Sequence, residues 1–243
     1  MSDALWQDKV DLAAALRLAV RCQFHEGIDN HFTLGLAGRQ DRFFLHPYGL
    51  HWSEIRASDI MVVDEAGQVV EGEGIAETSA VCIHGPVHRA HPEGRCVLHT
   101  HMPYATALAM VEGGRLEPAS QTALMYYDDV AYDPDYSGLA ATTAEGERLA
   151  AIMGDKRVLL MANHGALVVG QTVAEAFHRL YFLERACQTQ VYAMSTGRAL
   201  KLIGDNMAAA TNVQLRAELP TSAMAFFTAM KRLLDRDDPG YLQ

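Results

Sequence analysis

Two histidines separated by one residue, His99 and His101, end a short apolar run that begins at Cys96. A run of this length predicts a β-strand, in which alternate side chains point to the same face. The two imidazoles are therefore expected to share a face. Pro103, which has no amide hydrogen, is expected to end the strand just beyond them. Ligands of α/β proteins commonly bind at strand ends, so the pair indicates a binding site.

A third histidine, His164, lies in the turn Asn163-His164-Gly165, after the apolar run at residues 158–161. Three neutral imidazoles with one free coordination position are typical of a catalytic site for a divalent metal ion rather than a closed structural site. The same residues are also compatible with a surface strand and a turn that bind nothing. Spacing alone does not decide between these interpretations.

The composition limits the class of protein. A chain of 243 residues that is 49% hydrophobic can bury a full core, and we expect a single domain over residues 1–243. Lys and Arg number 20 against 30 Asp and Glu, a net charge of −10 without a basic cluster, which argues against nucleic acid or an anionic membrane as a partner. The four cysteines lack paired spacing and the N-terminus lacks the pattern of a secretory signal, so a cytoplasmic location is expected.

Periodicity and turn residues predict the elements around these motifs. Together they predict an α/β fold, a three-layer α/β/α domain with a mixed, largely antiparallel central sheet. In the first half of the chain the predicted elements are a helix over residues 7–26 ended by Gly27, hairpins within residues 32–46 and 60–70, and a helix from Thr78 or Ser79 to His91. A loop is predicted at residues 128–138, and helices that begin with capping boxes are predicted at Thr142 and Thr172. Two C-terminal helices are predicted at about residues 205–235, broken near Pro220 and packed on this domain or on a neighbouring subunit.

The H-x-H strand, the Asn163-His164-Gly165 turn, the run Tyr104-Ala105-Thr106-Ala107 and the Asn30 turn together resemble the class II aldolase/adducin family, over about residues 10–195. The resemblance implies an α/β/α domain, commonly assembled as a homotetramer, that holds a divalent ion. Zinc is the expected ion, and manganese or iron are the alternatives. Carried over by position, the metal ligands are His99, His101 and His164.

The resemblance also implies a catalytic glutamate on the helix before H-x-H, four residues before a histidine. Counting back from His84, this position holds Ala80, which can neither transfer a proton nor bind a metal. Glu77, one helical turn away, is the candidate replacement, although a glutamate there is also favoured simply as a helix N-terminal charge. His84 matches a family position near the site and is a second catalytic candidate, or else a buried histidine bonded to backbone.

Family aldolases bind substrate phosphate through an Asn, a Thr-Gly turn and a Ser-Ser pair. The residues Asn30, Gly49, Thr78 and Ser79 match in kind and are the predicted substrate-binding residues, but Tyr48 replaces the threonine and no basic cluster compensates. Candidate proton donors are Tyr126, Tyr127, Tyr132 and Tyr136. The histidines interpreted as structural, because spacing gives them no partner, are His25, His31, His46, His51, His91 and His178.

These observations predict a divalent-metal-dependent lyase acting on a small hydroxy-carbonyl or carboxylate substrate, by aldol-type cleavage or decarboxylation through a metal-stabilised enolate. The alanine at position 80 favours decarboxylation, which needs no separate base. Two alternatives stay open: a non-heme iron oxygenase on the same three histidines, and a non-catalytic, adducin-like interaction module. The identity of the bound metal distinguishes the three.

Overall fold

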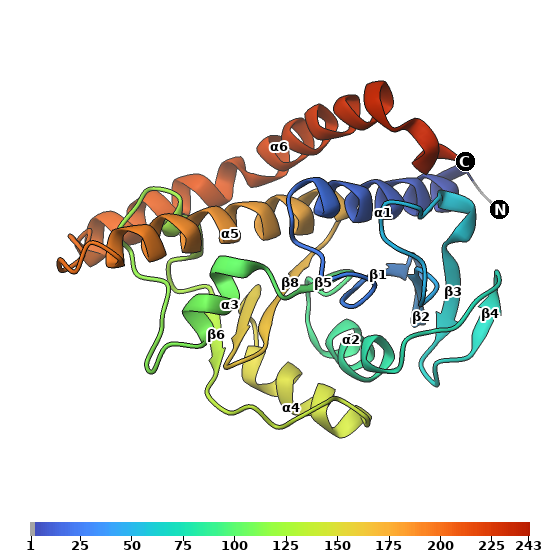
Figure 1. Ribbon diagram of the computed structural model, residues 1–243, viewed down its shortest axis with the longest axis horizontal. Coiled ribbons are helices and arrows are strands. Elements are labelled where there is room, and N and C mark those ends of the chain that lie inside the picture. Colours follow the sequence, from blue (N-terminus) through green and yellow to red (C-terminus); the bar gives the residue numbers. More distant parts are fainter. Residues whose placement is uncertain (1–2) are drawn as a thin grey trace.

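One mixed β-sheet forms the centre of the molecule (Figure 1). Its strands in the structure, a computed structural model that describes residues 3–243, are β1 (His31–Leu36), β2 (Arg39–Leu45), β3 (Met61–Asp64), β4 (Val69–Glu71), β5 (Cys96–Thr100), β6 (Val130–Asp133), β7 (Val158–Met161) and β8 (Gly165–Gly170). In these residues the eight strands pair in the order β4-β3-β2-β1-β5-β8-β7-β6. β6 and β7 are parallel, and the other neighbours are antiparallel. The prediction of a mixed, largely antiparallel sheet is confirmed.

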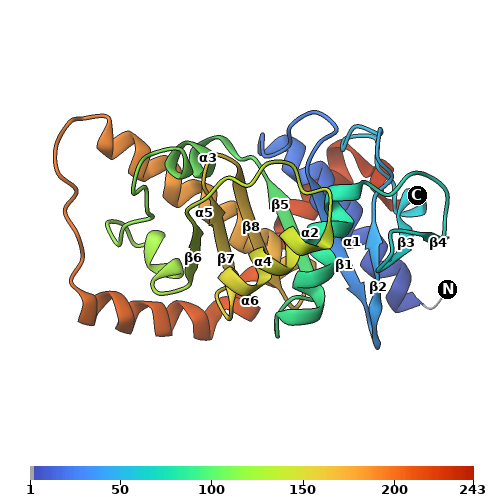
Figure 2. The same ribbon diagram turned by 90° about the horizontal axis from the view of Figure 1, so that it is seen from below.

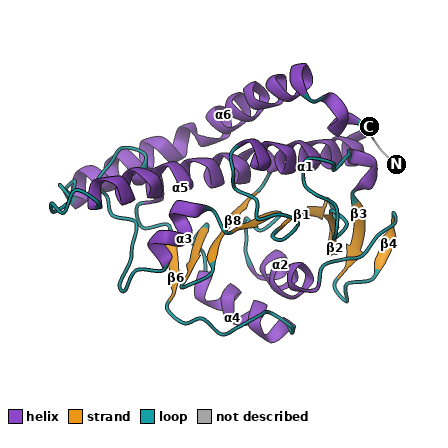
Figure 3. Cartoon of the chain, in the orientation of Figure 1, coloured by secondary structure: helices purple, strands orange, loops and turns teal. Residues whose placement is uncertain are grey.

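Helices cover both faces of this sheet. They are α1 (Asp3–Arg21), α2 (Thr78–Ala90), α3 (Pro103–Ala109), α4 (Thr143–Met153), α5 (Val173–Met194) and α6 (Asp205–Asp237). α1, α5 and α6 lie on one side, and α2 and α4 lie on the other (Figure 2), so the strands form the middle layer (Figure 3). Buried apolar side chains join the layers, including Leu16, Leu98 and Phe177 on the first side and Val87 and Leu167 on the second. This is the predicted three-layer α/β/α arrangement.

The first helix ends earlier than its apolar pattern predicted. α1 ends at Arg21, whereas Gly27 was expected to end it. Gln23 has a φ of 60°, and the N–H groups of Phe24 and Gln23 donate to the carbonyl groups of Ala19 and Val20. This is a Schellman motif, which ends the helix while Phe24 packs into the core at 3% exposure. Phe24 thus continues the apolar pattern without being helical.

The loop predicted at residues 128–138 contains a strand instead. β6 pairs in parallel with β7 at the edge of the sheet. The aspartates that suggested a loop are buried through ion pairs, since Asp133 binds Arg148 and Asp129 binds Arg157. A paired carboxylate can be buried at modest cost, and its arginine is distant in sequence, so composition misleads here.

The C-terminal segment is one helix, not two helices broken near Pro220. α6 continues through the exposed Pro220, which removes a single backbone donor. Buried residues on either side, Asn212 and Phe227, hold the helix against the domain, where it packs on α5 and α1. The contacts before and after the proline therefore outweigh one lost hydrogen bond.

The two hairpins and the start of α5 are confirmed, and the capping box at Thr142 differs in detail. The predicted hairpins form as β1–β2 and β3–β4, and α5 begins at the N-cap Thr172, whose side chain accepts from the Glu175 N–H. Thr142 is the N-cap of α4, but its side chain makes no capping bond. No helix within residues 3–243 combines the length and the apolar character needed to cross a bilayer.

Candidate metal centre

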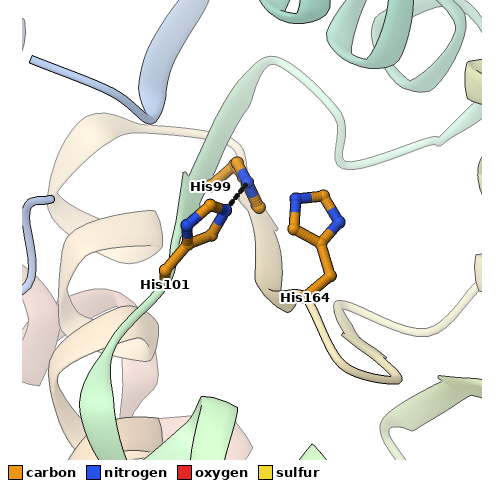
Figure 4. Close-up of side chains that lie close together, drawn as sticks. All are labelled: His99, His101 and His164. Carbon is orange, nitrogen blue, oxygen red and sulfur yellow. Dashed lines mark hydrogen bonds between the residues drawn. The ribbon is translucent and has the colours of Figure 1, made fainter. Parts of the chain in front are cut away.

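The side chains of His99, His101 and His164 meet beyond the end of β5, beside the turn between β7 and β8 (Figure 4). One ring nitrogen of each lies within 4.8 Å of the others. The Nε2 atoms of His99 and His101 are 3.1 Å apart, close to the separation of about 3.4 Å between two nitrogens bound to one tetrahedral zinc ion. The fold therefore brings together the three histidines predicted as ligands.

The hydrogen bonds of the Nδ1 atoms of His99 and His101 determine which nitrogen of each ring is available to an ion. His99 Nδ1 donates to the carbonyl oxygen of Ala166 at 3.0 Å, and His101 Nδ1 donates to the carboxylate of Glu26. A neutral imidazole with its hydrogen on Nδ1 carries a lone pair on Nε2. With both rings in this neutral form, the two lone pairs would face each other across 3.1 Å, and a cation placed between them would attract both. The donor set fits a divalent metal ion.

Burial keeps the imidazoles of His99 and His164 uncharged near neutral pH. It lowers the pKa of His99 well below its usual value, and the neighbouring His164 lowers this pKa further. Burial also lowers the pKa of His164 to about 4, with His101 as the second cause. Neutral imidazole is the form in which histidine binds a metal ion.

The turn that carries His164 requires two special backbone positions. Asn163 has a φ of 57°, in the left-handed region that asparagine tolerates better than most residues. Gly165 follows, where a Cβ atom would lie 2.6 Å from the Thr100 carbonyl oxygen and 2.9 Å from His101 Cδ2. The missing Cβ lets the turn pack against His101, which places His164 beside it.

The three histidines open into a cavity of about 740 Å³, a size that accommodates a small molecule. Its wall contains the predicted residues Asn30, Glu77, Thr78 and Ser79. Gly49 lies in the loop after β2 and does not belong to the described residues that line the cavity. Of the four candidate tyrosines, Tyr136 belongs to the wall.

Glu26, which sequence reasoning did not select, also belongs to this wall, and its carboxylate accepts from Nδ1 of His101, a candidate metal ligand. We expect Glu26→Ala to weaken zinc affinity by about 10–100-fold, because loss of a carboxylate bonded to a ligand histidine has effects of this size. Competition with a zinc chelator measures the affinity. Asp29→Ala, which removes another carboxylate from the same wall, is the matched control. Equal zinc affinity in wild type and Glu26→Ala would rule out the orienting role.

Glu77 is the N-cap of α2, a role that the sequence assigned to Thr78 or Ser79. Its carboxylate accepts from the N–H groups of Ser79 at 3.0 Å and Ala80 at 2.9 Å, and from Ser79 Oγ at 2.6 Å. The free N–H groups and the dipole of a helix N-terminus favour a carboxylate there. The same side chain is therefore both a helix-terminal charge and part of the cavity wall.

His31 is not merely structural, as the sequence suggested, because it lines the cavity. The antiparallel register of β1 and β5 sets His31 opposite His99, and their ring centroids are 5.0 Å apart. On the side of α2, His31 Nε2 lies 3.0 Å from Ser79 Oγ. Pairing register between distant strands cannot be read from local spacing, so no local pattern indicated this contact.

A buried chain of hydrogen bonds continues behind His31. Its Nδ1 lies 2.9 Å from His84 Nε2, and His84 Nδ1 lies 2.7 Å from Thr33 Oγ1. Thr33 Oγ1 lies 2.8 Å from His88 Nε2, and His88 Nδ1 donates to the Gly94 carbonyl. His84 is fully buried and is not among the described residues of the wall. It touches the cavity only through His31.

The buried His46 makes stability depend on pH. It packs against Trp52, and burial lowers its pKa to about 3, with His31 as a second cause. The unfolded chain binds this proton near pH 6.5, so between these values the folded protein holds fewer protons and acid favours unfolding. We expect the metal-free protein to lose about 1.5 kcal/mol of unfolding free energy through this side chain between about pH 6.5 and pH 5. Urea unfolding at several pH values measures it; an unchanged pH dependence in His46→Leu would contradict it.

α3 begins directly after the H-x-H segment and is capped by a distant residue. Glu184 of α5, 4% exposed, accepts from the N–H groups of Tyr104 at 2.8 Å and Ala105 at 2.9 Å. Pro103, at the first position of the helix, needs no acceptor. Glu184 thus ties α5 to the segment that carries His99 and His101.

Comparison with known proteins agrees with this fold and site. Residues 10–191 match the family described as Class II Aldolase and Adducin N-terminal domain. A Caulobacter vibrioides protein, named provisionally as an aldolase class 2 protein, is 35% identical over 99% of this chain and 94% of its own length. The crystal structure of an aldolase II superfamily protein from Pseudomonas syringae is 34% identical, with a TM-score of 0.92 over 99% of this chain and 97% of that one.

Similarity also extends to a second branch. Human beta-adducin is 34% identical over 172 residues, which are 69% of this chain and 23% of beta-adducin. The family match at residues 10–191 contains all three clustered histidines. The family match covers most of the chain, and the fold agrees with it, so the chain belongs to the class II aldolase and adducin family.

Proposed function

We propose that this protein is a divalent-metal-dependent lyase that acts on a small hydroxy-carbonyl or carboxylate substrate. The observation that carries the proposal is the cluster of His99, His101 and His164 at the wall of a cavity, with one ring nitrogen of each within 4.8 Å of the others. When bound, the ion would supply Lewis-acid stabilisation of negative charge on a substrate oxygen. Zinc suits three imidazoles, and manganese or iron are the alternatives.

The side chains of the wall take the remaining roles in this proposal. Glu77 accepts a proton from the substrate, and Tyr136, which also belongs to the wall, donates a proton back to the substrate. Asn30, Thr78 and Ser79 bind the substrate, while His84 positions His31 from behind. Gly49, outside the wall, has no part in it.

Glu77→Gln tests the proton transfer. We expect the zinc-loaded variant to exchange the carbon-bound hydrogens of dihydroxyacetone for deuterium about 10²-fold more slowly than wild type, because an amide cannot accept the proton. Proton NMR in deuterated water measures the exchange, and Glu73→Gln, in the exposed loop before α2, is the control. Wild-type exchange rates in Glu77→Gln would remove Glu77 from the mechanism.

The similarity to beta-adducin supports a second candidate, a non-catalytic interaction module. Elemental analysis of protein purified without added metal separates the candidates. Zinc or manganese near one ion per chain supports the lyase, iron supports the oxygenase, and a metal-free protein supports the module. We also propose a cytoplasmic location and, from the family resemblance, a homotetramer, which light scattering after size-exclusion chromatography measures.

A further inference from the structure

The wall around the candidate metal centre is acidic. Glu26, Asp29 and Glu77 contribute carboxylates, and none of the described residues that line the cavity is Lys or Arg. A bound divalent ion would leave a net charge of 2 − 3 = −1 from these groups. A phosphate or carboxylate group of a ligand would therefore enter a region that already has an excess of negative charge.

The arginine that reaches the adjacent loop does not change this balance. Arg148 approaches Ser137 at 3.4 Å, beside the wall residue Tyr136. Its guanidinium donates to Asp133 at 2.6 Å and to Glu145 at 2.7 Å. Two carboxylates thus already neutralise this one cation.

Glu77 itself occupies the place where the wall could hold an anion. Backbone N–H groups at a helix N-terminus are a common anion-binding site. The N–H groups of Ser79 and Ala80 lie at the N-terminus of α2, which is the end of the helix nearest the cavity. Both already donate to the Glu77 carboxylate, as does the Ser79 hydroxyl. A ligand anion would have to displace this carboxylate before it gained any of these hydrogen bonds.

Two other polar atoms of the wall lack partners and suit an uncharged oxygen. Asn30 Nδ2 and Thr106 Oγ1 are buried without a hydrogen bond. Asn30 is 7% exposed, and its Oδ1 already accepts from the His101 N–H at 3.2 Å, so Nδ2 is the group left free. A buried donor without an acceptor is costly, and a hydroxyl or carbonyl oxygen of a ligand would satisfy it.

We propose that this cavity selects an uncharged hydroxy-aldehyde or hydroxy-ketone, and that Glu77 excludes phosphorylated and carboxylated compounds by occupying their subsite. The inference deepens the proposed function and rests on it for the chemistry. The exclusion of anions does not depend on a bound ion, so it can be tested separately.

Inorganic phosphate is the probe for anion exclusion, titrated calorimetrically into metal-free protein. Glu77→Ala, which frees both N–H groups, is expected to bind phosphate at least about ten-fold more tightly than wild type. Glu77→Gln, whose single amide oxygen can cap only one of the two N–H groups, is expected to gain less than Glu77→Ala, and Asp29→Asn, which only removes a charge, is expected to gain about three-fold or less. Glu77→Gly, a residue tolerated at N-caps, gives the same comparison if the alanine variant does not fold. Wild-type protein that binds phosphate as tightly as Glu77→Ala overturns the proposal.

Dihydroxyacetone and its phosphate ester, with zinc-loaded protein and ligand-observed NMR, test the ligand class. Wild type is expected to bind the uncharged compound at least about ten-fold more tightly, with the order reversed in Glu77→Ala. Asn30→Asp, which keeps the acceptor for the His101 N–H but loses the free donor, is expected to weaken dihydroxyacetone binding at least about ten-fold. Preference of wild type for the phosphate ester overturns the proposal. Failure of the proposed function is seen separately. In that case the purified protein holds no metal, but its variants still show the expected order of phosphate affinities.

Discussion

Replacement of His99 by Ala is expected to weaken zinc binding by at least about 10³-fold. Structural zinc sites contribute about 10–16 kcal/mol of binding free energy, so the loss of one of three protein ligands removes roughly 4 kcal/mol. His164→Ala should have a similar effect, because its ring nitrogen lies within 4.8 Å of the other two ligand atoms. Competition with a fluorescent chelator measures the affinity, and elemental analysis measures the zinc that stays bound.

His51→Ala is the matched control for these variants. It removes an imidazole that lies outside the described cavity wall and bonds only a nearby loop residue, Ser53, through its Nδ1 atom. Its zinc content should equal that of wild type. Stoichiometric zinc in both His99→Ala and His164→Ala would refute the metal centre, and the proposed lyase with it.

The second large effect concerns stability. Glu184→Ala is expected to lower the free energy of unfolding by about 3 kcal/mol, since it leaves the N–H groups of Tyr104 and Ala105 without acceptors in a mostly buried place. Urea denaturation measures the change. Because α3 begins directly after the H-x-H segment, zinc affinity should fall in the same variant.

Glu184→Gln removes the charge and one of the two acceptors, and keeps the other. Burial raises the pKa of Glu184, which means that the protein environment disfavours its charged form. Glutamine has the same length but keeps only one of the two acceptor oxygens, so one N–H group stays capped and we expect a loss of about 1.5 kcal/mol, smaller than that of Glu184→Ala. If Glu184→Ala unfolds at the same midpoint urea concentration as wild type, α3 needs no cap from α5.

Local sequence patterns predicted the parts of this molecule that neighbours along the chain determine. The H-x-H run and the Asn163-His164-Gly165 turn were enough to select the three histidines that cluster, because strand alternation and turn chemistry act over a few residues. The capping pattern at Thr172 likewise located the start of α5. Such signals need no knowledge of the tertiary structure.

Residues that act across long sequence separations were missed for a physical reason. His31 reaches the cavity through its register with His99, Glu26 orients His101, and Glu184 caps a helix 80 residues away. The loop predicted at residues 128–138 fails in the same way, because Asp133 is buried only through the distant Arg148. Periodicity carries no information about which distant side chains meet.

The hydrogen-bonded chain behind the cavity holds one hydrogen too few. Ser79, His31, His84, Thr33 and His88 each bring one when uncharged, whereas the carboxylate and the carbonyl at its two ends only accept. Five hydrogens thus serve the six contacts along the chain, so at least one contact joins two lone pairs, and the Val97 carbonyl oxygen, 3.4 Å from Thr33 Oγ1, competes for the same hydrogens. This mismatch can shift along the chain as the imidazoles exchange tautomers. Each arrangement of tautomers therefore places the unsatisfied contact at a different depth behind the wall, with no change in net charge.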